Sequence, residues 1–414
     1  MVNRDELIHD WNLMPGAPDF GGTAVQLDDE TLRDGLQNPS VTDPPIERKI
    51  ELLHLMAELG IDAADIGLPG AGPRAYEAVS ALAHEVVDQK LPIQVNAAAR
   101  TVVADIEPIV RISQETGLHF EVGAFIGSSP IRKYAEGWDT AQILETSTTA
   151  VEFAVSEGLD VMYVTEDTTR SRPDDLTALF TAAIEAGAHR ICLADTVGHA
   201  TPHGVRQLVR FAKRLVANTG EDVKIDWHGH RDRGWGLANA FAAIEEGVDR
   251  VHGTALGIGE RVGNVEMDLL LVNLVLFGID DRELTALPRY CRLAADMCGV
   301  PLPHNYPVVG DDAFRTGTGV HAAAIIKAMK TGDRWVEDAV YSGVPASLVG
   351  LEQLIEISPV SGLSNVRFWL AKNGHDAEDG ELCDAVFALA KRCSRTLTRI
   401  EIEAEITGVL EART

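Results

Sequence analysis

The sequence predicts an α/β fold: a (β/α)8 TIM barrel followed by a mainly helical C-terminal accessory region. From residue 24 to residue 280, eight short β-like runs alternate with amphipathic segments, several of which end near a glycine that suits a helix C-cap. After residue 280 this alternation stops and helical patterns dominate. A doubly wound open sheet shows the same alternation, but eight repeats in roughly 250 residues favour the barrel.

The β-like runs follow one another in the order expected for barrel strands. They are AVQLDDETL (24–32), ADIGLPG (64–70), IQVNAAAR (93–100), HFEVGAFIG (119–127), DVMYVTED (160–167), RICLADTVG (190–198), VKIDWHGH (223–230) and RVHGTALGIG (250–259). Segments such as IERKIELLHLMAELG and LTALFTAAIEAG provide the helices between them.

Three parts of the chain are expected. These are an N-terminal extension (1–23), the barrel (24–280) and helical accessory subdomains (281–414). Accessory helices are predicted at 281–297, 319–330, 350–356 and 381–397, with TGTGVH and YSGVPASLVG as loops and the last residues frayed.

Bulk properties exclude several classes of protein. A net charge of −27, from 63 acidic and 36 basic residues, opposes binding to nucleic acid. The five cysteines form no CxxC pair, so reduced thiols and a cytoplasmic location are expected. The N-terminus lacks a signal-peptide pattern, and no stretch approaches the ~20 apolar residues of a membrane span. We therefore expect no nucleic-acid and no membrane partner.

Two histidines follow the seventh run. His228 and His230 stand at i and i+2, so on an extended segment both side chains point to the same side. DETLRDGLQ places Arg33 and Asp34 at the corresponding end of the first run. Asp34 with the two histidines offers the mixed oxygen and nitrogen set of a catalytic divalent metal, either zinc, manganese, cobalt or magnesium. The structural alternative is that Arg33 and Asp34 form ion pairs at the barrel rim.

The segment GIGERVGN follows the eighth run. Its Asn264 is a candidate fourth ligand through the amide oxygen, and the alternative is a turn asparagine after Gly263. Its glycines offer backbone N–H groups to an anionic part of a cofactor, although glycine clusters more often mark turns.

These motifs resemble those of a known family. DETLRDGLQ and HGHRDRGWGLANAFAAIEEGVDRVHGTALGIGERVGN are similar to the signature regions of the 2-isopropylmalate, homocitrate and citramalate synthases, with hydroxymethylglutaryl-CoA lyase a more distant member. FRTGTGVHAAAIIKA, VYSGVPASLVG and SPVSGLSNVRFWL are similar to the synthases' linker subdomains, and the resemblance implies that residues 281–414 contain no regulatory domain. The resemblance implies an acyltransferase that condenses acetyl-CoA with a 2-oxo acid in a Claisen-type step followed by thioester hydrolysis.

The resemblance also implies a role for each matching residue in the barrel. Asp34, His228, His230 and Asn264 would hold the divalent ion, which the 2-oxo acid would chelate. The residues expected to contact substrate or acetyl-CoA are Arg33 at the keto oxygen, Thr196 at the carboxylate, Asp65 near the substrate, and Gly259 and Glu260 at the cofactor.

Proton transfer is assigned by the same resemblance to Glu166, His321 and Tyr341. His321 would reach the active site of a partner, which predicts a homodimer. The alternatives are an ion pair of Glu166 with Arg170, a place for His321 beside a helix N-terminus, and packing for Tyr341.

Two positions depart from the synthase pattern. Leu36 stands where an acidic or amide residue is common, and Asp65 stands where a glutamate is common. The acceptor expected first is 3-methyl-2-oxobutanoate, which would place the enzyme in leucine biosynthesis. Pyruvate, oxaloacetate, 2-oxoglutarate and a larger oxo acid remain open, as do a metal-dependent carbon–carbon lyase and a non-catalytic sensor.

Overall fold

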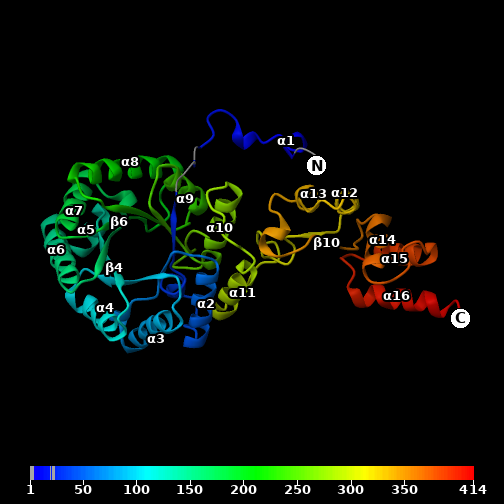
Figure 1. Cartoon of the computed structure of the whole chain (residues 1–414), viewed down its shortest axis with the longest axis horizontal. Helices are drawn as coiled ribbons and strands as arrows, with labels where there is room; N and C mark the ends of the chain where they lie inside the picture. Colours follow the sequence, from blue (N-terminus) through cyan, green and yellow to red (C-terminus); the bar gives the residue numbers. More distant parts are fainter. Residues whose placement is uncertain (1–3, 19, 21–23) are drawn as a thin grey trace. The chain divides into compact units, whose positions relative to one another are not determined.

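The computed structural model describes residues 4–18, 20 and 24–414. Within these residues, eight parallel strands close a barrel in which each strand pairs with the next and β1 pairs with β8 (Figure 1). The strands are β1 (Gln26–Asp29), β2 (Ala63–Asp65), β3 (Gln94–Arg100), β4 (Phe120–Gly127), β5 (Asp160–Glu166), β6 (Arg190–Asp195), β7 (Lys224–Gly229) and β8 (Arg250–Gly253). The predicted TIM barrel is confirmed, and every strand overlaps one of the predicted runs.

Helices form a ring around these strands (Figure 1). They are α2 (Ile46–Glu58), α3 (Pro73–Gln89), α4 (Val103–Thr116), α5 (Pro130–Glu136), α6 (Thr140–Ser156), α7 (Pro173–Glu185), α8 (Pro202–Thr219), α9 (Gly236–Glu245), α10 (Met267–Leu276) and α11 (Leu287–Cys298), after the short α1 (Arg4–Leu7). Gly117 and Gly220 cap α4 and α8 with φ of 71° and 78°, which glycine adopts without strain. None of the helices in the described ranges is long and apolar enough to cross a membrane.

Alternate residues of each strand point into the barrel, because successive side chains of a strand face opposite sides. Asp226 and His228 of β7 accordingly contact side chains of other strands inside the barrel. Arg250 and His252 of β8 do the same. Strands β7 and β8 therefore carry polar side chains inward, and β7 carries the apolar Trp227 toward the helices.

The chain divides into two compact units. The barrel unit comprises residues 1–282 and 290–300, and the accessory unit comprises residues 283–289 and 301–414. The expected boundary at residue 280 differs from this division, because most of α11 belongs to the barrel unit.

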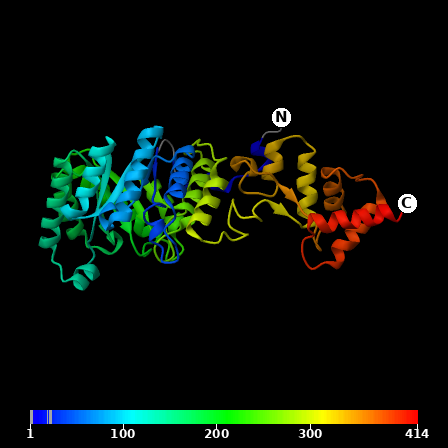
Figure 2. The same ribbon diagram turned by 90° about the horizontal axis from the view of Figure 1, so that it is seen from below.

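The accessory unit is mainly helical, with a small two-stranded sheet. It contains β9 (Arg315–Thr316), α12 (Gly319–Met329), α13 (Arg334–Ala339), β10 (Leu354–Ile355), α14 (Leu363–Lys372), α15 (Gly380–Arg392) and α16 (Arg399–Glu411). The last three helices, orange to red in Figure 2, bury one apolar core that includes Val366, Val386 and Ile402.

Several predictions for this unit are wrong. The helix expected at 350–356 is replaced by β10, which pairs with β9, and Gly350 before it has a left-handed φ of 71°. TGTGVH is also not a simple loop, since it ends inside α12. Helix α16 starts with a capping box at Thr398 and ends at Glu411, and Arg413 beyond it pairs with Asp379 at 2.7 Å.

Candidate active site

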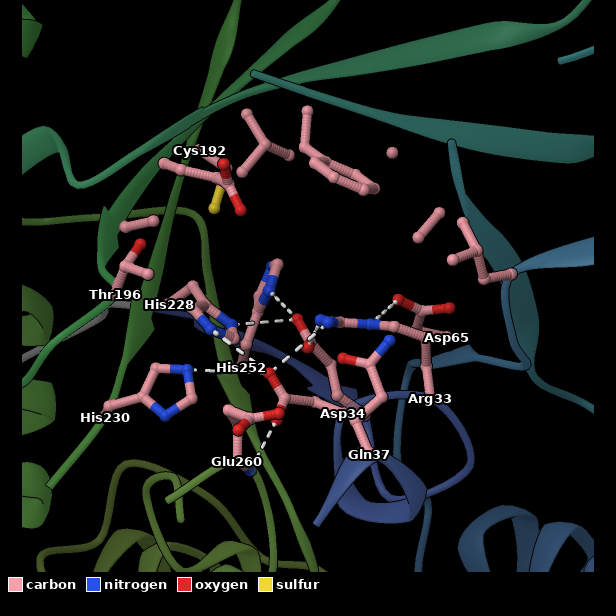
Figure 3. Close-up of a pocket in the computed structure, with 18 of the residues that line it drawn as sticks. Arg33, Asp34, Gln37, Asp65, Cys192, Thr196, His228, His230, His252 and Glu260 are labelled. Atoms are coloured by element: carbon pink, nitrogen blue, oxygen red, sulfur yellow. Dashed lines mark hydrogen bonds and ion pairs between the residues drawn. The ribbon is translucent and has the colours of Figure 1, made fainter. Parts of the chain in front are cut away.

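A pocket of about 370 Å³ opens at the carboxyl-terminal ends of the barrel strands (Figure 3). Its lining includes the predicted residues Arg33, Asp34, Asp65, Glu166, Thr196, His228, His230 and Glu260. The structure therefore brings together, in one cavity, side chains that lie up to 227 positions apart in the sequence, from Arg33 to Glu260.

The candidate metal ligands face one another in this pocket. Asp34 Oδ2 lies 3.5 Å from His230 Nε2 and 3.8 Å from His228 Nε2, and all three side chains are buried. A divalent ion with ligand bonds of about 2.0–2.2 Å can bridge atoms at this spacing. The two histidines, two positions apart, therefore point to the same side, as expected.

Asn264 and Gly259 lie next to Asp34, although neither is in the described lining of the pocket. Both polar atoms of the Asn264 amide, and Nδ1 of His230, are buried without a hydrogen-bond partner among the residues that the structure describes. A Cβ on Gly259 would lie 2.2 Å from Asn264 Nδ2 and 2.9 Å from Asp34 Oδ1, so only glycine lets this loop pack against both. The Glu260 backbone N–H donates to Asp34 Oδ1 at 3.1 Å.

The charges of the site suit a dication. Burial alone would raise the pKa of Asp34, but Arg33, His230 and His228 hold it well below its ordinary value. Burial, with His230 beside it, holds the pKa of His228 well below its ordinary value, which leaves a neutral imidazole suited to ligation. Three carboxylates, those of Glu30, Asp34 and Asp65, stand against the one guanidinium of Arg33, an excess of two negative charges.

Glu30 and His252 are part of the site, and the sequence reasoning missed both. Glu30 Oε1 lies 3.0 Å from His228 Nδ1 and 2.6 Å from His252 Nδ1, and Oε2 pairs with Arg33. A carboxylate on the far nitrogen of a ligating histidine fixes the orientation of its ring. The sequence contained a signal for both residues. Glu30 lies two positions after Asp28, and His252 lies two positions after Arg250, so strand alternation predicts that both side chains point into the barrel.

Arg33 is held by three carboxylates. Its Nε donates to Asp65 Oδ2 at 2.7 Å, Nη1 contacts Asp34 Oδ2 at 3.3 Å, and Nη2 contacts Glu30. Burial raises the pKa of Asp65 to about 6, although Arg33 opposes this shift. The guanidinium is therefore fixed at the pocket wall beside the candidate ligands, as Figure 3 shows.

Glu166 ends β5 and lines the pocket. The alternative ion pair with Arg170 is wrong, because Arg170 instead binds Asp167 at 2.7 Å, and the nearest cation to Glu166 is Arg132, with Nη2 at 3.6 Å. Burial raises the pKa of Glu166, with Arg132 and Arg33 acting against it. Its side chain is one-third exposed, so a substrate can reach it.

Thr196 and the segment around Leu36 complete the lining. The Asp167 backbone N–H donates to Thr196 Oγ1 at 2.8 Å, which leaves the hydroxyl hydrogen to donate to a ligand. Leu36 is half-buried, and it is the neighbouring Gln37 that reaches the pocket. Leu36, which departs from the synthase pattern, therefore influences the pocket only indirectly.

His321 and Tyr341 lie together in the accessory unit. Their rings stack with centroids 4.2 Å apart and planes inclined by 28°. His321 stands in the first turn of α12, as one of the alternatives expected, and both side chains are exposed. The stacked pair thus offers a histidine and a phenol at one exposed spot.

Comparison with known proteins places the chain in a family. Residues 24–290 match the family model described as HMGL-like. The chain belongs to the HMGL-like family. The predicted resemblance is confirmed, and the match covers the barrel strands that carry all the pocket residues discussed above.

Relatives in this family include three kinds of synthase. A putative (R)-citramalate synthase of Methanopyrus kandleri is 33% identical, over 94% of this chain and 72% of that protein. A 2-isopropylmalate synthase of Halothermothrix orenii is 31% identical over 92% and 73%. A homocitrate synthase of Methanopyrus kandleri is 32% identical over 93% and 92%.

Solved structures show the same fold. A hydroxymethylglutaryl-CoA lyase from Pseudomonas aeruginosa superposes with a TM-score of 0.56 at 21% identity, covering 67% of this chain and 94% of the lyase.

Proposed function

We propose that this HMGL-like protein is an acyltransferase that condenses acetyl-CoA with a 2-oxo acid at a divalent metal held by Asp34, His228, His230 and Asn264. One observation carries the proposal: two imidazole nitrogens within 4 Å of one carboxylate oxygen face a pocket that also holds Arg33 and Glu166. The names of the synthase relatives support the same reaction class.

The protein's own groups divide the chemistry between them. When bound, a divalent ion polarises the acceptor carbonyl. Thr196 donates its hydroxyl to the acceptor carboxylate, and Arg33 faces the keto oxygen, where a fixed guanidinium stabilises developing negative charge. Arg33 is preorganised for this role by Asp65 and Glu30.

Glu166 is assigned as the base. Its carboxylate takes a proton from the methyl group of acetyl-CoA, the resulting carbon nucleophile attacks the keto carbon, and the carbonyl electron pair moves onto oxygen. Water then cleaves the thioester and releases the coenzyme A thiol. The raised pKa of Glu166 suits proton abstraction better than that of an exposed glutamate.

His321 and Tyr341 are assigned to proton transfer near the thioester, in the active site of a partner subunit of a homodimer. Mixing inactive His321→Ala and Glu166→Ala variants should then restore up to about a quarter of the activity per site, because each chain supplies what the other lacks. Heterodimers without recovered activity would contradict shared sites.

The extent of the alignments favours a synthase over a lyase. The match to the homocitrate synthase runs through the accessory unit and covers 92% of that protein, whereas the lyase structure covers only 67% of this chain. Among acceptors, we propose 3-methyl-2-oxobutanoate first, as for a 2-isopropylmalate synthase.

The test is release of free thiol from acetyl-CoA with a panel of 2-oxo acids, in metal-loaded and metal-depleted protein. We expect acceptor-dependent release that requires the metal. Cleavage of hydroxymethylglutaryl-CoA without any condensation would show a lyase instead, and binding of an oxo acid without turnover would show a sensor.

A further inference from the structure

The pocket has two chemically different halves. Strands β1, β2, β7 and β8, with the loops that follow them, supply most of its charged side chains, including Glu30, Asp34, Asp65 and His228, and Glu166 at the end of β5 adds one more. Strands β3 to β6 supply an apolar wall. This wall consists of Ala98, Gly123, Phe125, Met162, Val164, Cys192 and Ala194. In Figure 3, Cys192 marks this wall, opposite Arg33 and Asp34.

The wall follows directly from the strand alternation. On β4 the pocket residues are Gly123 and Phe125, and on β5 they are Met162 and Val164, in each case two positions apart. The register pairs Gly123 with Met162 and Phe125 with Val164, so the residues lie in two apolar levels below Glu166. The side chain of a ligand that points away from the charged half therefore contacts carbon atoms at both levels.

The guanidinium groups in the described lining of the pocket are already paired with carboxylates, so none is available to bind a second carboxylate of an acceptor. Arg33 and Arg261 are the guanidinium groups in its described lining. Arg33 contacts three carboxylates, and Arg261 is paired with Asp232 at 2.8 Å. Arg132 outside the lining is paired with Glu136 at 3.0 Å and with Glu166.

We propose, on the basis of the proposed condensation, that the acceptor is a 2-oxo acid with one carboxylate and an apolar side chain, which packs against the wall of strands β3 to β6. The carboxylate and keto groups lie at the charged half, and the side chain lies along the apolar levels. An acceptor with a second carboxylate would bury that charge against carbon atoms, beside an excess of acidic groups and without a counter-ion.

Gly123 sets the length of the side chain that fits. A methyl group at Gly123 would make ordinary contacts, 3.4 Å to Met162 Cε and 3.7 Å to Ala98 Cα, so Gly123→Ala fits the backbone while filling the lower apolar level. Val164→Ala has the opposite effect, since it removes two methyl groups from the same wall.

The experiment compares kcat/KM across pyruvate, 3-methyl-2-oxobutanoate, 4-methyl-2-oxopentanoate, oxaloacetate and 2-oxoglutarate in the metal-loaded protein. We expect the branched apolar acceptors to exceed both dicarboxylates by at least about 100-fold. A preference for a dicarboxylate would overturn this inference while leaving the condensation intact. Absence of turnover with every acceptor would instead contradict the proposed function.

Matched variants test the wall itself. Gly123→Ala should lower kcat/KM for the branched acceptors relative to pyruvate by about 10-fold or more, and Val164→Ala should shift preference toward the longest acceptor. Gly204→Ala on α8, where the nearest atom would be 3.9 Å away, is the control and should leave the profile unchanged. Unchanged ratios in both folded pocket variants would remove this wall from acceptor selection.

Discussion

The barrel interior holds two layers of charge that behave differently. The lower one, here called the arginine layer, consists of Glu121, Arg190, Asp226 and Arg250. Asp226 accepts from Arg190 at 2.6 Å and from Arg250 at 2.7 Å, and Glu121 is paired with both arginines. Within these four described residues two positive charges balance two negative ones, and none of their buried side-chain atoms lacks a partner. Asp28, 3.6 Å from Arg250, adds a third carboxylate with one unpaired buried oxygen, but it does not line the pocket.

The upper layer, at the pocket, is not balanced. Its three carboxylates face one guanidinium, and His230 and Asn264 carry buried atoms without partners in the described part of the chain. His252 joins the layers, with Nδ1 2.6 Å from Glu30 and Nε2 2.9 Å from Asp226. Buried charge alone therefore does not mark a functional site. Unpaired buried polar atoms and an unneutralised charge beside a cavity mark such a site.

The largest effect should come from removing the divalent metal that the upper layer is proposed to bind. Chelation should abolish thiol release, and a divalent ion should restore it. His228→Ala should lose both the metal and turnover while remaining folded, because the arginine layer below is intact. Elemental analysis, circular dichroism and the thiol assay measure these outcomes. Full activity in verified metal-free protein would contradict the assignment.

The next effect falls on stability. Arg250→Met should lower the free energy of unfolding by about 3–5 kcal/mol, because it leaves Asp226 and Glu121 buried with one partner fewer. Chemical denaturation of metal-free protein should show a smaller loss for His228→Ala. Equal losses of unfolding free energy in the two variants would mean that the arginine layer contributes no more to stability than the upper layer does.

Glu30→Gln tests the support of the upper layer. Weakening the contact to His228 should reduce metal affinity by about 10–100-fold and alter the visible spectrum of the cobalt-loaded protein. Glu260→Gln is the control, since Glu260 lines the same pocket but contacts Asp34 through its backbone N–H. Equal affinities of the Glu30→Gln and unaltered proteins would exclude a positioning role.

The smallest effect concerns pH. A base acts in its ionised form, so kcat/KM should rise with pH through the pKa of Glu166, at a midpoint above the ordinary value of 4.5 because burial raises that pKa. Arg132→Gln should move the midpoint to higher pH, since Arg132 lowers the pKa of Glu166. An unchanged midpoint would show that Arg132 does not influence the pKa of the base.

Local patterns were enough to predict the barrel and the group of Asp34, His228 and His230. Strand alternation fixes which side chains point inward, and closure of a parallel barrel places all strand ends on one rim. The same reasoning failed for 350–356 in the accessory unit, where apolar residues were assigned to a helix but Leu354 and Ile355 pair with β9. A short apolar run fits either structure until a partner strand is known.

Only the tertiary structure decided which charged groups pair. Sequence proximity suggested Arg170 for Glu166, yet Arg170 binds Asp167, and Arg132 from the helix after β4 lies beside Glu166. Glu30 orients His228 across 198 positions of sequence. The sequence alone determined which side chains point inward, because that depends on neighbouring residues. The contacts among those side chains depend on strand register and barrel closure, which bring distant residues within a few ångströms.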